Sequence, residues 1–320
     1  MQGLRCALLA LAVAVSHAAF GQAYPVKPVK IVVPYPPGAS TDTVARAVAQ
    51  KLSDSLGQQV FVENRAGASG NIGSDYVAKS APDGYTILMA TDATHTTNVH
   101  FGKNFPYDPV KDFTPITAAA GNIIVLVAHP SVPVTSVKEL IEYAKKNPGR
   151  LSYASSGTGS PHHLSGELLR QLAGIDIVHV PYKGGGQAIT DLLGGQVPLM
   201  FSSMVTVAPH IKTGKVRALG VVEASRYPAM PDIPTIAETL PGFEINSWLG
   251  FLAPAGLSPA IQARLQAEIV KALNAPDVRA RLEPAGLVVI GSTPGELATM
   301  IKTDLDKRGR LIKAAGIQTD

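Results

Sequence analysis

Residues 29–52 read VKIVVPYPPGASTDTVARAVAQKL and contain the patterns of a strand, a loop and a helix in succession. Val29 to Pro34 is a short apolar run, which is typical of a buried strand. Small and polar residues occupy positions 38–41. Beyond them, apolar side chains recur at steps of four, at Val44, Val48, Leu52 and Leu56. This spacing places them on one face of a helix, so the stretch predicts a β-strand joined to an α-helix by a tight loop.

The same alternation continues along the chain. Residues 59–64 (QVFVEN) and 86–91 (TILMAT) have strand patterns, and residues 71–80 between them have a helical pattern. The resulting order β-α-β-α-β predicts a parallel sheet with right-handed crossovers.

Two long apolar segments without helical spacing interrupt this rhythm, at residues 113–128 and 247–254. Between them lies a second set of strands and helices, and three helical patterns follow the second segment. If both segments cross between domains, the C-terminal part returns to the first domain. The sequence therefore predicts an α/β chain of two domains, each a mainly parallel sheet flanked by helices, joined by crossing strands. Domain I comprises residues 24–122 plus 248–320, and domain II comprises residues 123–247.

The first 23 residues have the pattern of an export signal that is cleaved near Ala23-Tyr24. Arg5 precedes a nine-residue apolar run at positions 7–15, and small residues follow it. As a helix this run would reach about 14 Å, roughly half of a hydrocarbon core. A buried N-terminal helix and a membrane anchor are weaker alternatives. Cys6, the only cysteine, precedes the run and is not placed to carry a lipid. We expect a soluble, monomeric protein of the periplasm.

Composition limits the classes of partner. The chain has 320 residues, of which 46% are hydrophobic and 16% are charged, with a formal net charge of +4. Lys and Arg are dispersed and form no cluster with interleaved aromatic residues, so we expect no nucleic-acid partner. A mildly basic protein suits a small anionic ligand.

Two polar, glycine-containing loops follow strands and open helices, at residues 35–42 (YPPGASTD) and 155–160 (SSGTGS). Ligands of open parallel sheets bind at the carboxyl ends of strands, where such loops lie. The N-terminus of a helix also favours a carboxylate or phosphate. Facing each other from two domains, the loops would clamp a carboxylate. The alternative is that both are merely tight turns with good helix caps.

Motifs for chemistry are absent from the sequence. It contains no G-x-G-x-x-G, no G-x-x-x-x-G-K-[ST] and no G-x-S-x-G. His162, His163 and Glu167 match no zinc-binding spacing, so we expect neither a metal nor a cofactor. A secreted hydrolase using a serine with His95 or His163 is an alternative without a recognisable nucleophile motif. We expect His163 to hydrogen-bond a loop, and His95 either to contact ligand or to brace a loop.

Several short motifs, in order and over nearly all of the chain after residue 23, carry a resemblance. They are VPYPPG at 33–38, VENRAGA at 62–68, PDGYT at 82–86, SGTGS at 156–160, VPYKG at 180–184, GKVRAL at 214–219, PTIAE at 234–238 and WLG at 248–250. In number and order they resemble Bug-type periplasmic substrate-binding proteins of the tripartite tricarboxylate transporters, although no single motif is specific.

The resemblance implies a protein of two domains that closes like a flytrap on a small carboxylate and performs no chemistry. It implies delivery of the ligand to the membrane components of a tripartite tricarboxylate transporter. A ligand-occupied sensor that docks a receptor kinase remains an alternative. Ligands of the family include acidic amino acids, tricarboxylates, nicotinate-like compounds and aromatic dicarboxylates. The loops corresponding to Gly38–Thr41 and Thr158–Ser160 hold the carboxylate, partly through bridging waters.

The sequence departs from the family pattern at two positions. Ala39 stands where the first loop often has a second glycine, and Ser202 stands where many members have aspartate. Without that aspartate an ammonium group has no counter-charge, which favours a di- or tricarboxylate or an aromatic carboxylate that lacks an amine. The ligand-binding residues that we predict are Tyr35, Gly38, Ala39, Ser40, Thr41, Thr94, His95, Ser156, Thr158, Gly159, Ser160, Ser202 and Ser203.

Overall fold

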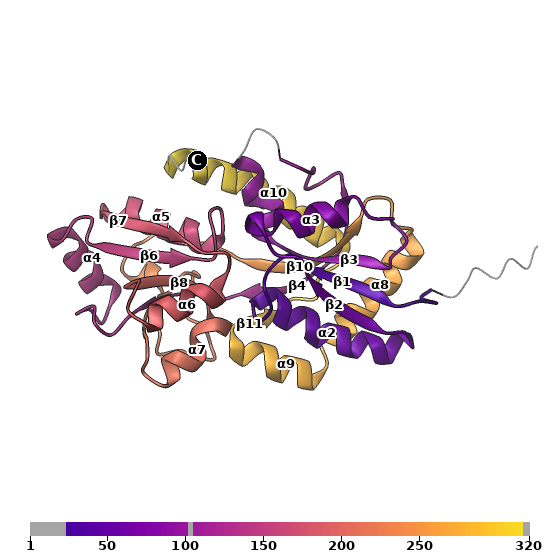
Figure 1. Cartoon of the computed structure of the whole chain (residues 1–320), viewed down its shortest axis with the longest axis horizontal. Coiled ribbons are helices and arrows are strands. Elements are labelled where there is room, and N and C mark those ends of the chain that lie inside the picture. The colour runs from indigo at the N-terminus through magenta and orange to yellow at the C-terminus, as the bar shows by residue number, and fades with distance from the viewer. Residues whose placement is uncertain (1–23, 102–104, 316–320) are drawn as a thin grey trace, which may run out of the picture.

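The computed structural model describes residues 24–101 and 105–315, so the predicted signal peptide lies outside the described residues. Two β-sheets organise the chain (Figure 1). The six-stranded sheet has the order β11-β4-β10-β3-β1-β2, and the five-stranded sheet has the order β7-β6-β8-β5-β9. We call the six-stranded sheet with its helices lobe I and the five-stranded sheet with its helices lobe II.

The strands of lobe I are β1 (Val29–Val33), β2 (Val60–Asn64), β3 (Thr86–Thr91), β4 (Phe113–Asn122), β10 (Trp248–Pro254) and β11 (Leu287–Val289). Those of lobe II are β5 (Ile124–Ala128), β6 (Leu151–Ser155), β7 (Ile177–Pro181), β8 (Leu199–Ser203) and β9 (Arg217–Val221). Strand β1 pairs in parallel with β2 and β3, as the β-α-β-α-β pattern predicts. The crossing strands add antiparallel pairs, so both sheets are mixed and not mainly parallel as predicted. The α/β fold with two helix-flanked sheets is confirmed.

The predicted crossing segment at 113–128 is divided between the two sheets. Strand β4 ends at Asn122 in lobe I, and β5 begins at Ile124 in lobe II. The chain returns before Trp248, where β10 begins. The two crossings lie side by side, because the Asn122 N–H donates to the Ser247 carbonyl oxygen at 2.9 Å.

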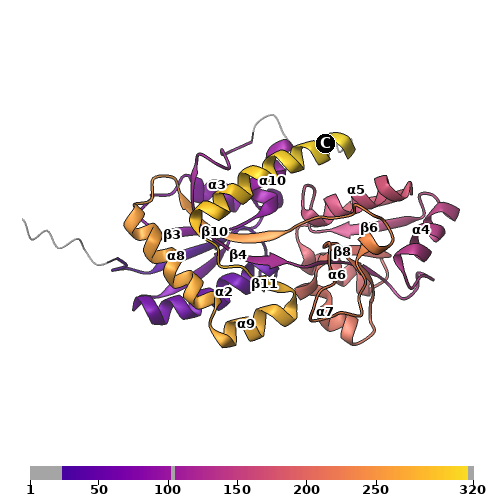
Figure 2. The same ribbon diagram turned by 180° about the vertical axis from the view of Figure 1, so that it is seen from behind.

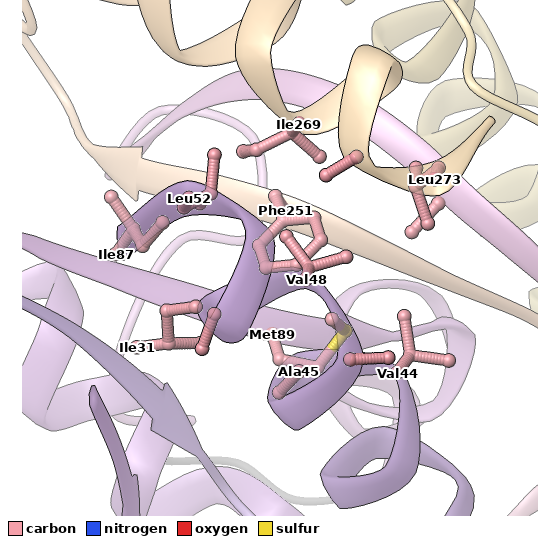
Figure 3. Close-up of a cluster of buried hydrophobic side chains, with 14 of the residues drawn as sticks. Ile31, Val44, Ala45, Val48, Leu52, Ile87, Met89, Phe251, Ile269 and Leu273 are labelled. Carbon is pink, nitrogen blue, oxygen red and sulfur yellow. The ribbon is translucent and has the colours of Figure 1, made fainter. Parts of the chain in front are cut away.

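Helices cover both faces of the lobe I sheet. One face carries α2 (Ser40–Leu56), α8 (Pro259–Leu273) and α9 (Pro276–Leu282), and the other carries α3 (Asn71–Ala78) and the first turns of α10 (Pro294–Ala315). Figure 3 shows the first of these cores, in which Val48 and Leu52 of α2 pack with Phe251 of β10. Alternate residues of β1 point to the two faces: Ile31 lies in this core and Val32 in the opposite one.

Lobe II has the same layered arrangement. Helices α4 (Val137–Lys146) and α5 (Pro161–Ala173) pack on one face, and α6 (Gly185–Leu193) and α7 (Met204–Lys212) pack on the other. The sequence did not predict α7 or β11. Helix α7 contains Pro209, which is unfavourable inside a helix, and β11 has only three residues.

Helix α10 connects the lobes a third time. Its first turns place Leu297 and Ile301 in a core of lobe I, whereas Leu311 and Ile312 pack with the core of lobe II. Figures 1 and 2 both show the helix running from lobe I toward α5. Among the helices of the described residues, we find none that combines the length and apolar character of a membrane span.

Candidate ligand-binding site

A cleft lies between the lobes and has two parts. The inner part offers about 50 Å³ to the centres of water-sized molecules, enough for roughly four waters at about 10–15 Å³ each. The outer part offers about 780 Å³ and is lined by residues of the loops at 66–70, 156–158 and 181–187 with Tyr35 and Pro36. The inner wall comprises Tyr35, Ala39, Ser40, Thr41, Thr91, Asp92, Ala93, Asn122, Ser156, Pro161, His162, Gly184, Gly185, Ser202, Ser203, Thr206, Ser247 and Leu249.

The first wall is the start of α2. Gly38 has a φ of 83°, a left-handed conformation that glycine adopts without strain, and its N–H donates to Asp42 Oδ2 at 3.0 Å. Asp42 also accepts from Arg46 Nε at 2.9 Å and from Asn64 Nδ2 at 3.0 Å. Burial acts to raise the pKa of Asp42, but these hydrogen bonds prevail and hold it below its usual value. The carboxylate thus fixes the turn that presents Thr41 to the cleft.

Four helix N-termini meet at the inner cleft. It is lined by residues from the starts of α2, α5, α6 and α7, namely Ser40, Thr41, Pro161, His162, Gly184, Gly185, Ser203 and Thr206. Each N-terminus presents backbone N–H groups without intrahelical partners and about half a positive charge. Among the described residues, no Lys or Arg lines this inner wall. The inner part of the cleft therefore favours an anion through the helix N-termini and not through a cationic side chain of its described wall.

Two buried hydroxyl groups on opposite walls lack a hydrogen-bond partner among the described residues. They are Thr41 Oγ1 in lobe I and Ser202 Oγ in lobe II, on side chains of residues that are each 1% exposed. An unsatisfied buried hydroxyl costs about 1–3 kcal/mol. A ligand that supplies acceptors in the cleft would satisfy both groups.

His162 ties the two serine-containing edges of lobe II together. Its Nδ1 lies 2.6 Å from Ser156 Oγ, and its Nε2 lies 3.3 Å from Ser203 Oγ. Burial lowers the pKa of His162 to about 4, so the ring is neutral near pH 7. A neutral imidazole donates from one nitrogen and accepts at the other, so this histidine orients both hydroxyl groups.

The floor of the inner cleft is a polar network between the crossing strands and α10. Asp92 Oδ2 lies 3.2 Å from the Arg308 guanidinium, and Ser247 Oγ donates to Asp92 Oδ1 at 3.4 Å. Asn122 Nδ2 donates to Ser247 Oγ at 3.3 Å. Burial raises the pKa of Asp92 to about 7, against the opposite effect of Arg308.

The two lobes touch at the mouth of the cleft. Ser69 Oγ of lobe I donates to the Thr158 carbonyl oxygen of lobe II at 2.9 Å. A β-carbon on Gly159 would lie only 2.8 Å from Asn98 Oδ1 and 2.9 Å from the Phe101 ring. The structure is therefore a closed form, in which glycine at position 159 permits the contact.

The structure brings most of the predicted site residues to the cleft. Tyr35, Ala39, Ser40, Thr41, Ser156, Ser202 and Ser203 line the inner part, and Thr158 lines the outer part.

The other predicted residues lie behind these walls. Gly38 shapes the start of α2, Ser160 accepts from the His163 N–H as the N-cap of α5, and Gly159 makes the contact between the lobes. Thr94 and His95 are fully buried, with Thr94 Oγ1 2.9 Å from His95 Nδ1.

Two histidines near the site support the structure from within. The His95 ring packs edge-on against Phe113, with ring centroids 4.6 Å apart, so His95 braces the interior and does not line the cleft. His163 Nδ1 accepts from the Gly159 N–H at 3.2 Å, which confirms the predicted hydrogen bond to a loop. Within residues 24–101 and 105–315, no three His, Cys, Asp or Glu residues form a group that could hold a metal ion.

Sequence reasoning missed several residues of the inner wall. Asp92 directly follows the carboxyl end of β3, so the rule that selected the two loops could also have selected it. Asn122 and Ser247 lie at the crossings between sheets, a position that only the fold reveals. The residues missed are Thr91, Asp92, Ala93, Asn122, Pro161, His162, Gly184, Gly185, Thr206, Ser247 and Leu249.

Relatives of the chain share most of its length. The family model described as "Tripartite tricarboxylate transporter family receptor", TctC, matches residues 44–317. A Pseudomonas sp. (strain P51) protein named "UPF0065 protein in tcbD-tcbE intergenic region" is 41% identical over 91% of this chain and 87% of its own length. Protein BugT of Bordetella pertussis is 37% identical over 92% of this chain and 90% of its own length.

Solved structures agree with this assignment. An R. palustris protein determined with adipate has a TM-score of 0.90 and 36% identity, covering 92% of this chain and 99% of its own. MatC from Rhodopseudomonas palustris, with bound malate, has a TM-score of 0.85 and 34% identity, covering 90% of this chain and 100% of its own. The chain therefore belongs to the TctC family, the Bug-type periplasmic solute-binding proteins of tripartite tricarboxylate transporters, which are not enzymes.

Proposed function

We propose that the protein captures a small dicarboxylate that carries no amine, and delivers it to the membrane components of a tripartite tricarboxylate transporter. The observation that carries this proposal is the convergence of four helix N-termini on a cleft whose described inner wall contains no Lys or Arg. The structures with adipate and malate support the ligand class, because both ligands are dicarboxylates without an amine.

The interactions available in the cleft are strong enough for uptake at low concentration. A helix N-terminus contributes about 0.3–2 kcal/mol, and each hydrogen bond to a charged group contributes about 1.5–3 kcal/mol. A few of these reach the roughly 8 kcal/mol of micromolar binding after the cost of ordering the ligand. One carboxylate fits the inner part, and the remainder of an elongated ligand extends into the outer part.

An amino-acid ligand fits this cleft less well. Asp92 is the acidic residue of the inner wall, and its carboxyl group is already paired with Arg308. Ser202 supplies a neutral hydroxyl where an aspartate would attract an ammonium group. Beside Ser202, an ammonium group would therefore be desolvated without a counter-charge.

The proposal is tested by calorimetric titration of the purified protein with adipate, malate, a tricarboxylate and L-glutamate. We expect a dicarboxylate to bind most tightly, and preference for L-glutamate would contradict the proposal. Transport is tested separately, because deleting the gene should abolish uptake of the bound dicarboxylate. Retained uptake together with a lost transcriptional response would instead indicate the sensor role.

A matched pair of variants on one helix tests the binding mode. Thr41→Val removes the unpaired hydroxyl group that lines the cleft and should weaken dicarboxylate binding by about 5- to 160-fold, which corresponds to about 1–3 kcal/mol. Thr43 does not line the inner cleft, and its hydroxyl group donates to the Ala39 carbonyl oxygen at 3.1 Å. Thr43→Val should therefore change the affinity little. Equal losses in the two variants would show that the helix, and not the hydroxyl group, is responsible.

A further inference from the structure

Asp92 occupies an unusual place between the cleft and the C-terminal helix. It lines the inner cleft, is 1% exposed, and pairs with Arg308, a residue of α10 that is itself 4% exposed. Arg308 also donates to the Asn246 carbonyl oxygen, so its guanidinium is shared. Asp92 therefore lies in the wall of the cleft that we propose for an anionic ligand, and the cation paired with its carboxyl group is shared with another acceptor.

A second buried aspartate beside the same cleft shows how weakly Asp92 is compensated. Asp42 accepts three hydrogen bonds of 2.9–3.0 Å, from Arg46, Gly38 and Asn64. Asp92 has contacts of 3.2 Å to Arg308 and 3.4 Å to Ser247, and the Ala93 N–H also favours its charged form. The pKa values follow this difference, because that of Asp42 is lowered, whereas burial raises that of Asp92 to about 7.

Resting on the proposed function, we propose that Asp92 takes up one proton as the cleft binds a dicarboxylate dianion. One ligand dianion and one proton from solvent enter together, and the proton forms an O–H bond on the Asp92 carboxylate. Uptake of the proton removes the repulsion between two carboxylates that share a poorly hydrated space.

The contacts of Ser247 explain how the proton would improve binding. When Asp92 is charged, the Ser247 hydroxyl group donates to it and accepts from Asn122. A protonated Asp92 can donate to Ser247 Oγ instead, since a hydroxyl oxygen accepts two hydrogen bonds. The Ser247 hydroxyl proton is then free to turn into the cleft, which Ser247 lines, and to donate to the ligand.

Other titratable groups surround Asp92 and must be separated from it. Asp304 and Arg308 lie on α10, and Tyr35 reaches the same region from the loop after β1. His162 lines the cleft from α5. It competes with Asp92 as the site of proton uptake, because an anion beside it would also favour its protonated form. His95, on the same turn as Asp92, is buried against Phe113.

The test is titration of the purified protein with adipate and with malate in phosphate and in Tris, whose ionisation enthalpies differ. At pH 7.5 we expect wild type to take up more than half a proton per ligand. The affinity should fall about tenfold between pH 6 and pH 8, because the free protein loses the Asp92 proton over that range. Binding without proton uptake and with a flat pH profile would overturn this inference and leave the proposed function standing. Failure of every carboxylate to bind would overturn both.

Variants assign the proton to one residue. Asp92→Asn should still bind the dicarboxylate but lose the proton uptake and the pH dependence. Two control variants should retain the proton uptake, namely Asp304→Asn and His162→Asn. Asparagine at position 304 still offers an acceptor to Trp248 Nε1. If Asp92→Asn does not fold, the His162→Asn result still decides, because uptake that disappears in His162→Asn would overturn the assignment to Asp92.

Discussion

Replacing Ser202 by aspartate tests the selectivity that we infer for the cleft. Ser202 Oγ is buried in the inner wall, so the new carboxylate would lie near the carboxylate of a bound dianion. Two such charges about 4–5 Å apart repel by roughly 3–4 kcal/mol at an effective dielectric constant of about 20. The loss of binding free energy cannot exceed roughly 4 kcal/mol at pH 7, because a larger repulsion would lead the new aspartate to take up a proton. That protonation requires its pKa to rise about three units above the ordinary value, at about 1.4 kcal/mol per unit. Ser202→Asp should therefore weaken adipate binding by about 10²- to 10³-fold.

The same change should favour a ligand that carries an ammonium group. L-Glutamate gains an attraction to the new charge, so its affinity relative to adipate should rise. Calorimetric titration of both ligands at pH 7 against wild type, Ser202→Asp and Ser202→Asn separates charge from shape, because asparagine matches aspartate in size. The reasoning is refuted if Ser202→Asn loses as much adipate affinity as Ser202→Asp, or if Ser202→Asp leaves both affinities unchanged.

Further predictions concern closure and stability. Gly159→Ala should weaken dicarboxylate binding at least tenfold in calorimetry, because its β-carbon would collide with Asn98 in the closed form. Gly174→Ala, at a similar positive φ with no atom within 4 Å of the new carbon, should cost stability but not affinity. Glu223 Oε1 accepts from the Ile124 N–H at 2.9 Å, and Oε2 is buried without a hydrogen-bond partner among the described residues. Burial raises the pKa of Glu223 to about 7. The buried charge of Glu223 therefore destabilises the fold increasingly as pH rises from about 4.5 to 7, and by a constant amount above that. Glu223→Gln should raise the free energy of unfolding by about 1–3 kcal/mol at pH 8 and leave it unchanged at pH 4. Equal increases at both pH values would contradict this. Small-angle scattering should show a smaller radius of gyration with saturating dicarboxylate, and no compaction would count against a hinged closure.

Local patterns were sufficient for most of the fold. Strand β3 covers Thr86–Thr91 as predicted, because its apolar run is bounded by clear turn residues. The sequence placed a domain boundary between residues 122 and 123 but treated residues 113–128 as one crossing segment. They form two strands, β4 and β5, because tertiary pairing assigns the two halves of the apolar run to different sheets. Helix α7 was missed for a related reason, because burial of Met204 and Val207 against lobe II overrides the local effect of Pro209.

The site was predictable only as far as loops could be recognised. The two glycine-containing loops follow strands, so the rule for carboxyl ends of strands identified both. After β3, the predicted residues Thr94 and His95 lie deeper than the wall of the cleft. There Thr94 Oγ1 donates to the Thr91 carbonyl oxygen at 3.0 Å, and the turn at Ala93–Thr97 carries Thr94 and His95 into the interior. Asp92 is left at the wall, and no periodicity in the sequence encodes that turn.

The course of α10 determines where an optical reporter of ligand capture can be attached. Two dyes attached along this helix would keep a fixed separation with and without bound ligand, because an α-helix has a constant rise of about 1.5 Å per residue. Dyes on opposite lips of the outer cleft, near residues 66–70 and 181–187, would approach each other as the lobes meet. With one end of α10 packed on each lobe, a fluorescent protein fused beyond its last turn would follow lobe II, whereas one fused before β1 would follow lobe I.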